Sequence, residues 1–78
     1  MRIEIRLYAT LRQYNPSAPW GVFSVDMPEG STAADVIAKV RIDAGEVRML
    51  MINGVGSKAD RVLADGDRVG LFPAVGGG

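Results

Sequence analysis

One stretch joins a predicted strand to a glycine-rich sequence: Arg68-Val69-Gly70-Leu71-Phe72-Pro73-Ala74-Val75-Gly76-Gly77-Gly78. Residues 68–72 are predicted to be the last long strand. Glycine has no Cβ and so the smallest cross-section, and a Gly-Gly carboxyl end can therefore enter a narrow channel in another protein. The alternative is a frayed or artificial terminus, since chain ends are commonly disordered. No other stretch of the sequence shows a pattern typical of catalytic side chains, so the candidate reactive group is the carboxylate of Gly78.

Length and composition predict one small domain with a true core. The chain has 78 residues, near the small end of what folds alone. Its apolar fraction of 47% is ordinary for a globular protein. Stability is accordingly expected to be modest.

The residue types that the sequence lacks narrow the possible functions. There is no cysteine, which excludes disulfides, thiolate catalysis and cysteine metal sites, and this fits a reducing cytoplasm. There is no histidine, so the commonest general base and metal ligand is absent. Nine basic residues balance nine acidic ones, which argues against nucleic-acid binding. No signal peptide or membrane-spanning run is recognised. We expect a cytoplasmic protein without a metal site.

Two strand patterns open the chain. Residues 2–8 alternate strictly, with Ile3, Ile5 and Leu7 on one face, which predicts a strand with one buried side. A short helical turn over 9–14 is possible, and a loop with two prolines follows.

Residues 20–27 alternate again and predict a second strand, paired with the first in a hairpin-like arrangement. Trp20 is interpreted as a core or rim plug rather than a ligand platform, because a large indole is costly to leave bare.

A helix is predicted to start at Thr32, whose hydroxyl can cap it, with Asp35 approximating a capping box. Gly45 is a plausible C-cap. Ile42 falls on the polar side, so either the helix has ended by then or Ile42 is exposed. The apolar helical face comprises Ala33, Val36, Ile37, Val40 and Ala44.

The remaining elements complete an α+β pattern. A third strand is predicted over 48–52, followed by the strong turn signal Asn53-Gly54. Residues 62–63 are predicted to form a short strand or an isolated core contact. Residues 65–67 are predicted to form a tight turn, and Asp65 and Asp67 are interpreted as turn residues rather than as a catalytic carboxylate pair. With the first and last strands placed together at the centre, one helix covers one face of a mixed four- to five-stranded sheet. This is the β-grasp, ubiquitin-like fold, with the domain at 1–73 and a flexible glycine tail at 74–78.

The sheet face away from the helix is a candidate partner site. If Val69 and Leu71 are core residues, alternation places Phe72 on the opposite face, together with Tyr8 and Met51. An apolar patch on an open sheet face commonly marks an interaction site. The alternative is that these residues cover one another, or that a strand register is wrong by one residue, which would reverse every side chain.

Several motifs resemble the sulfur-carrier proteins of the molybdopterin-synthase small-subunit type (MoaD-like). These motifs are Ile52-Asn53-Gly54, the segment 63–69, the segment 71–78, and an aromatic-Ala-x-x-Arg stretch from Tyr8 to Arg12. The resemblance spans the whole chain, and its amino-terminal stretch favours this branch over the thiamine-related ThiS-like branch. Gly76 departs from the pattern, since that position often carries a side chain in the family.

The resemblance implies a specific chemistry. A ubiquitin-activating-like (MoeB/ThiF-like) adenylating enzyme would use ATP and magnesium to adenylate the Gly78 carboxylate. A persulfide sulfur donor would then convert it to a thiocarboxylate, which delivers sulfur on the large subunit of molybdopterin synthase (MoaE-like). Gly77 and Gly78 would carry over position by position as the end that threads both active sites, and Gly76 and Gly77 would form the tail before the reactive carboxylate. The partner-binding residues would be Tyr8, Met51, Phe72, Pro73 and Val75.

Two alternatives stay open from the sequence. The activated tail could serve thiamine or another sulfur metabolite, or be attached to lysines of other proteins. In a different class, the chain could be a β-grasp interaction module with an inert tail. Either way it has no catalytic side chains of its own that the sequence identifies, and no cofactor of its own is expected.

Overall fold

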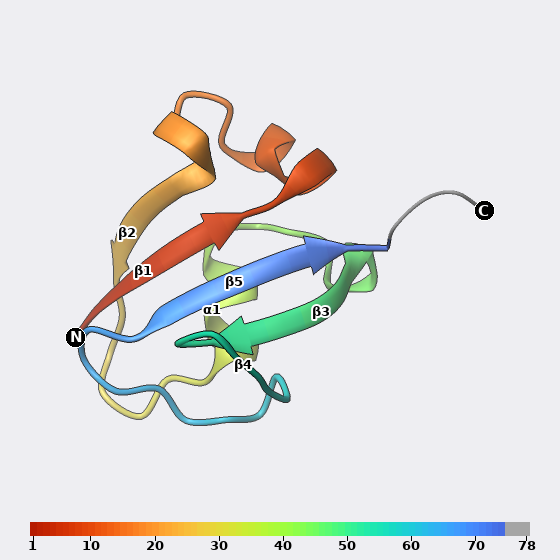
Figure 1. The fold of residues 1–78 in the computed structure, drawn as a ribbon. Coiled ribbons are helices and arrows are strands. Elements are labelled where there is room, and N and C mark those ends of the chain that lie inside the picture. The colour runs from red at the N-terminus through yellow and green to blue at the C-terminus, as the bar shows by residue number, and fades with distance from the viewer. Residues whose placement is uncertain (75–78) are drawn as a thin grey trace.

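The computed structural model describes residues 1–74, which form a five-stranded mixed sheet with the helix α1 (Ala33–Lys39) on one face (Figure 1). The strand order is β2-β1-β5-β3-β4. The predicted β-grasp fold is therefore confirmed. The strands are β1 (Arg2–Leu7), β2 (Val22–Asp26), β3 (Val47–Ile52), β4 (Val55–Gly56) and β5 (Arg68–Pro73). Short 3-10 helices lie at η1 (Ala9–Tyr14), η2 (Pro19–Gly21) and η3 (Ala44–Glu46).

The first and last strands pair at the centre of the sheet, as predicted. β1 and β5 run parallel, with Ile5 opposite Val69 and Leu7 opposite Leu71. β2 pairs antiparallel with β1, and β3 antiparallel with β5. Because β5 lies between β1 and β3 and is the last strand, it carries the chain along the middle of the sheet as far as Pro73.

The core fills the space between the sheet and α1. Alternate residues of β1 and β5 point into it, and all are essentially inaccessible to solvent. α1 contributes Ala33, Val36 and Ile37. The helix begins where predicted, because Thr32 and Asp35 form a complete capping box. The Asp35 N–H donates to Thr32 Oγ1 (3.2 Å), and the Thr32 N–H donates to Asp35 Oδ2 (2.8 Å).

The helix is shorter than the apolar pattern indicates, and the predictions for Ala44 and Gly45 are wrong. Of the two alternatives for Ile42, the first is confirmed, because the helix ends before it. α1 ends at Lys39, so Ala44 is exposed and not part of the helical face. Arg41 adopts a left-handed conformation (φ +61°) and returns the chain toward the core, where Ile42 is buried at 5% exposure. Gly45 is not the helix C-cap; it lies in η3, where its N–H donates to Asp43 Oδ1 (2.9 Å).

The prediction that Trp20 is a plug is wrong, since the residue is 83% exposed. The strand also begins later than predicted, at Val22. The cause is the neighbouring Gly21, which is buried against β1 at φ +73°; a Cβ there would lie 2.4 Å from the Leu7 carbonyl oxygen. Only glycine allows this approach. The tight turn that brings Gly21 inward places Trp20 at φ +59° and leaves its side chain in solvent.

The predicted turn at 65–67 is confirmed, and it involves the carboxylates as backbone acceptors. Asp65 Oδ1 accepts from the Arg2 N–H (2.7 Å), and Asp67 Oδ2 accepts from the Ala64 N–H (2.8 Å). Leu63 is an isolated buried contact, while Val62 bridges to Thr32 outside the strands. Within residues 1–74, no helix is long and apolar enough to cross a membrane.

Candidate partner-binding face

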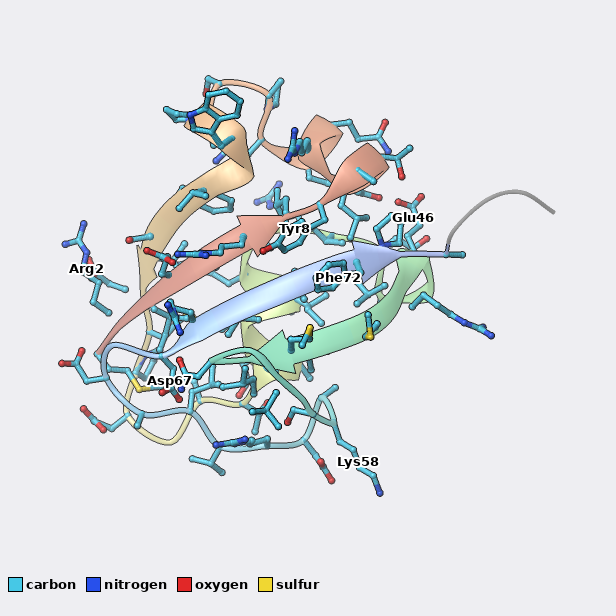
Figure 2. The ribbon with its side chains drawn as sticks, viewed as in Figure 1. Arg2, Tyr8, Glu46, Lys58, Asp67 and Phe72 are labelled. Carbon is cyan, nitrogen blue, oxygen red and sulfur yellow. The ribbon has the colours of Figure 1, made fainter. Side chains whose placement is uncertain are left out.

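The three residues assigned to the open sheet face do gather there. Tyr8 and Phe72 stack with ring centroids 4.1 Å apart and an interplanar angle of 5°. Met51 lies across the ladder from Gly70, and Met49 from Phe72. Figure 2 shows Tyr8 and Phe72 side by side over the sheet, with α1 on the far side. The predicted strand register is correct, whereas the partner-binding role of these residues stays a prediction.

Local backbone structure positions the Tyr8 ring. Tyr8 is extended and precedes η1, and Ala9 turns the chain with a positive φ of +50°. Leu11 then anchors η1 in the core, and Arg12 Nε donates to the Leu7 carbonyl oxygen (3.3 Å). The stretch from Tyr8 to Arg12 therefore forms a tight corner that keeps the aromatic ring against Phe72.

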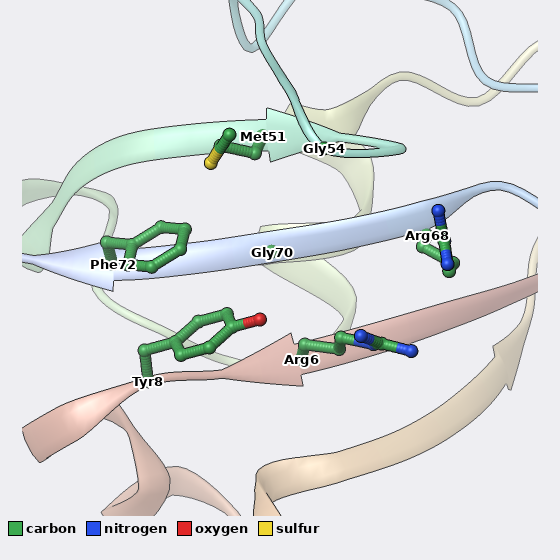
Figure 3. Close-up of a pocket in the computed structure, with 7 residues that line it drawn as sticks. All are labelled: Arg6, Tyr8, Met51, Gly54, Arg68, Gly70 and Phe72. Carbon is green, nitrogen blue, oxygen red and sulfur yellow. The ribbon is translucent and has the colours of Figure 1, made fainter.

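A small hollow opens beside the stacked rings (Figure 3). It has a volume of about 120 Å³, with Gly70 at its floor and Met51 along one side. The guanidinium groups of Arg6 and Arg68 lie at its other end. Arg6 pairs with Glu4 through Nε and Oε2 (2.7 Å), and this hydrogen bond raises the pKa of Arg6.

Sequence reasoning did not single out Gly70, Arg6 or Arg68. One signal was present in the sequence, namely a glycine in the middle of a regular strand, which often marks a close approach to that strand. The gathering of the two arginines depends on the strand order and could not be read from either strand alone.

The end of β5 opens into a second, larger groove. Pro73 belongs to the strand and lies opposite Val47, while Ala74 follows at the rim. The groove measures about 550 Å³ and is mostly apolar, lined by Tyr8, Ala9, Thr10, Arg48, Met49, Phe72, Pro73 and Ala74. The predicted site residues Val75, Gly76, Gly77 and Gly78 lie outside the described residues.

The described part of the chain presents features that are typical of a binding surface. Among residues 1–74, no three acidic side chains gather in a way that could hold a metal ion. The exposed features are instead an aromatic sheet face, two arginines and an apolar groove, all next to the strand that leads to the glycines. Aromatic and arginine side chains are enriched where proteins bind one another.

A five-stranded β-grasp sheet with such an open face defines a ubiquitin-like protein. The model of the ThiS family matches residues 5–78, and the chain belongs to this family. A search of the curated proteins found no match.

Three solved structures share the fold closely. SAMP1 from Haloferax volcanii is 22% identical, with a TM-score of 0.78 and complete coverage of both chains. A candidate molybdopterin converting factor subunit 1 from Pyrococcus furiosus is 25% identical, with a TM-score of 0.75 over 95% of this chain and 98% of that one. The Helicobacter pylori complex of molybdopterin-converting factor subunits 1 and 2 gives 20% identity, a TM-score of 0.65 and complete coverage of both chains.

Proposed function

We propose that this protein is a sulfur carrier whose Gly78 carboxylate is adenylated and converted to a thiocarboxylate that donates sulfur in molybdopterin synthesis. One observation carries the proposal. The ThiS family match extends through the glycines to residue 78, and the strand leading to them, β5, runs along an open aromatic face. A reactive tail beside a docking surface is the arrangement that a carrier needs.

The chemistry follows from the weak reactivity of a carboxylate. A free α-carboxyl group has a pKa of about 3.3–3.7 and is therefore an unreactive anion at neutral pH. A MoeB/ThiF-like enzyme would join it to the AMP unit of ATP, with magnesium bound and pyrophosphate released. Persulfide sulfur would then displace AMP. Cleavage of the resulting S–S bond by a thiol would leave the thiocarboxylate on Gly78.

Molybdopterin synthesis is the preferred destination for two reasons. The Tyr8–Arg12 stretch, which resembles the MoaD-like branch, forms the corner that supports the aromatic face. The Pyrococcus furiosus neighbour is a candidate subunit 1 of molybdopterin converting factor, and the Helicobacter pylori neighbour is bound to its subunit 2. We propose a MoaE-like large subunit as the partner and the cytoplasm as the location.

The deciding experiment is an intact-mass measurement after incubation with ATP, magnesium, a MoeB/ThiF-like enzyme and a persulfide donor. We expect a gain equal to one sulfur replacing one oxygen, confined to the peptide that contains Gly78. Gly77→Ala and Gly78→Ala should lose this gain. Gly56→Ala is the matched control, since that glycine has open space around it. The Gly56→Ala protein should gain the sulfur as the parent protein does.

An unchanged mass, in a mixture that converts a related carrier, would contradict the proposal and favour an interaction module. Addition of a MoaE-like subunit and the pterin precursor then tests the destination. Each Gly78 thiocarboxylate is expected to return to the carboxylate as it transfers one sulfur atom to the pterin precursor. Sulfur transfer only in a thiamine-forming mixture, or linkage of Gly78 to protein lysines, would assign the carrier to one of the other routes.

A further inference from the structure

Gly70 occupies an unexpected position. It lies in the middle of β5, the central strand, where glycine is less favourable than alanine by roughly 0.5–1 kcal/mol. Its φ is not in the left-handed region, so the backbone does not require glycine. Gly70 is buried at the floor of the hollow beside Tyr8, Phe72 and Met51, and a glycine within a strand often marks a site where another group approaches closely.

The space above Gly70 has three walls. A Cβ at this position would lie 3.4 Å from Tyr8 Cε2, 3.5 Å from Phe72 Cε1 and 3.9 Å from Met51 Cβ. An alanine would therefore fit without collision, but it would occupy part of the hollow. The volume of about 120 Å³ is well below the 300–1,000 Å³ that is usual for small-molecule sites. The hollow is the size for one inserted side chain.

The charge at the open end is positive. Arg6 is already paired with Glu4, whereas Arg68 is exposed and forms no ion pair among residues 1–74. Arg68 and Gly70 are two residues apart on one strand, so their side-chain positions are separated by roughly 6.6 Å along it. An extended peptide has the same spacing between alternate side chains. An apolar side chain over Gly70 can thus be followed, two residues along, by a carboxylate at Arg68.

We propose that the hollow over Gly70 receives an apolar side chain of a partner protein, and that Arg68 pairs with a carboxylate two residues away in the same partner segment. This inference rests on the proposed function only in taking the natural occupant to be a protein that handles the carrier. Gly70 and Arg68 are then specificity-determining residues, because the first selects by shape and the second by charge.

The test is a titration of isotopically labelled protein, followed by amide NMR shifts, with the capped tripeptides Leu-Ser-Glu and Glu-Ser-Leu, which cover both strand directions. We expect one of them to shift the amides of Met51, Arg68 and Gly70 with a saturable, millimolar affinity. The matching glutamine peptide should bind about fivefold more weakly, the value of one exposed ion pair. Added salt should remove that difference.

Variants separate the two parts of the proposal. Gly70→Val should weaken binding of the better tripeptide about tenfold or more, since it fills the hollow. Gly70→Ala, which fits the observed contacts, should have a smaller effect in the same direction. Arg68→Gln should make the glutamate and glutamine peptides equivalent. Gly56→Ala on strand β4, which pairs with β3 and not with β5, is the matched control and is expected to bind as the parent does.

Absence of shifts at these amides, or equal binding by the parent and both Gly70 variants, would overturn the claim that an apolar side chain enters the hollow over Gly70. Equal binding of the glutamate and glutamine peptides by the parent protein would overturn the claim that Arg68 pairs with a carboxylate. The titration needs no activating enzyme. A failure here is therefore distinguishable from a failure of the sulfur-carrier chemistry, which the mass measurement reports separately.

Discussion

Asp67 shows how one side chain can resemble a catalytic acid in the sequence and be structural in the fold. Its Oδ2 accepts from the Ala64 N–H, and its Oδ1 accepts from Asn53 Nδ2 (2.9 Å). Asn53 in turn accepts from the Arg68 N–H through Oδ1 (3.0 Å). These bonds link the turn between β3 and β4 to the turn that precedes β5. The bond from Ala64 and then that from Asn53 lower the pKa of Asp67.

A change of Asp67 to alanine should reduce the free energy of unfolding by about 1–3 kcal/mol at neutral pH, because the Ala64 and Asn53 donors lose their acceptor. The folded-state pKa lies below the ordinary value of about 3.9. The carboxylate therefore stabilises the protein above that value, and this contribution is lost as the pH falls through the folded pKa. Urea unfolding across this acid range should show a weaker pH dependence in Asp67→Ala. Asp60→Ala is the exposed control, and an equal loss in both variants would contradict the prediction.

At the scale of elements, local signals set where segments start better than where they stop. The capping box at Thr32 is visible in the sequence, and the helix begins there. The end at Lys39 follows from the need to return Ile42 to the core, which requires the left-handed Arg41. The turn η2 is a similar case, because the close contact of Gly21 with β1 decides where Trp20 points.

Trp20 is the only tryptophan, so its environment can be measured directly. Because it is exposed, its fluorescence emission and its quenching by acrylamide should change little on unfolding. Trp20→Gly should raise the free energy of unfolding by up to about 1 kcal/mol, since glycine relieves the left-handed strain. Trp20→Ala retains that strain and should be close to neutral. A large red shift of emission on unfolding, or a strong loss of stability in Trp20→Ala, would show a packed indole.

At the scale of the whole molecule, stability and the proposed chemistry reside in different parts of the chain. The buried core extends from Ile3 to Leu71, between α1 and the sheet. The candidate binding features lie on the opposite sheet face and around the end of β5. The proposed reactive group, on Gly78, follows this domain in sequence.

Removal of residues 76–78 should therefore leave the free energy of unfolding unchanged within about 0.5 kcal/mol. The same truncation should abolish the sulfur-dependent mass gain. Thermal unfolding followed by circular dichroism checks the first expectation, and intact mass checks the second. Leu71→Ala is the opposite control, expected to lose about 2–5 kcal/mol because it opens a cavity in the core. A truncated protein that is strongly destabilised would contradict this separation of roles.

The sequence alone predicts the β-grasp class, the central pairing of the first and last strands, the start of α1 and the face that carries Tyr8, Met51 and Phe72. The start of α1 and the face on which each strand residue lies are local properties, because alternation, caps and turn residues act within a few positions of one another. The fold class and the central pairing follow instead from the order of the elements and from the regularity of the first and last strands. The tertiary structure alone decided where α1 ends, that Trp20 is exposed, and that Gly70 and Arg68 share a hollow with Arg6. Such features depend on which distant segments meet, and that is set by packing over the whole sheet rather than by any one stretch.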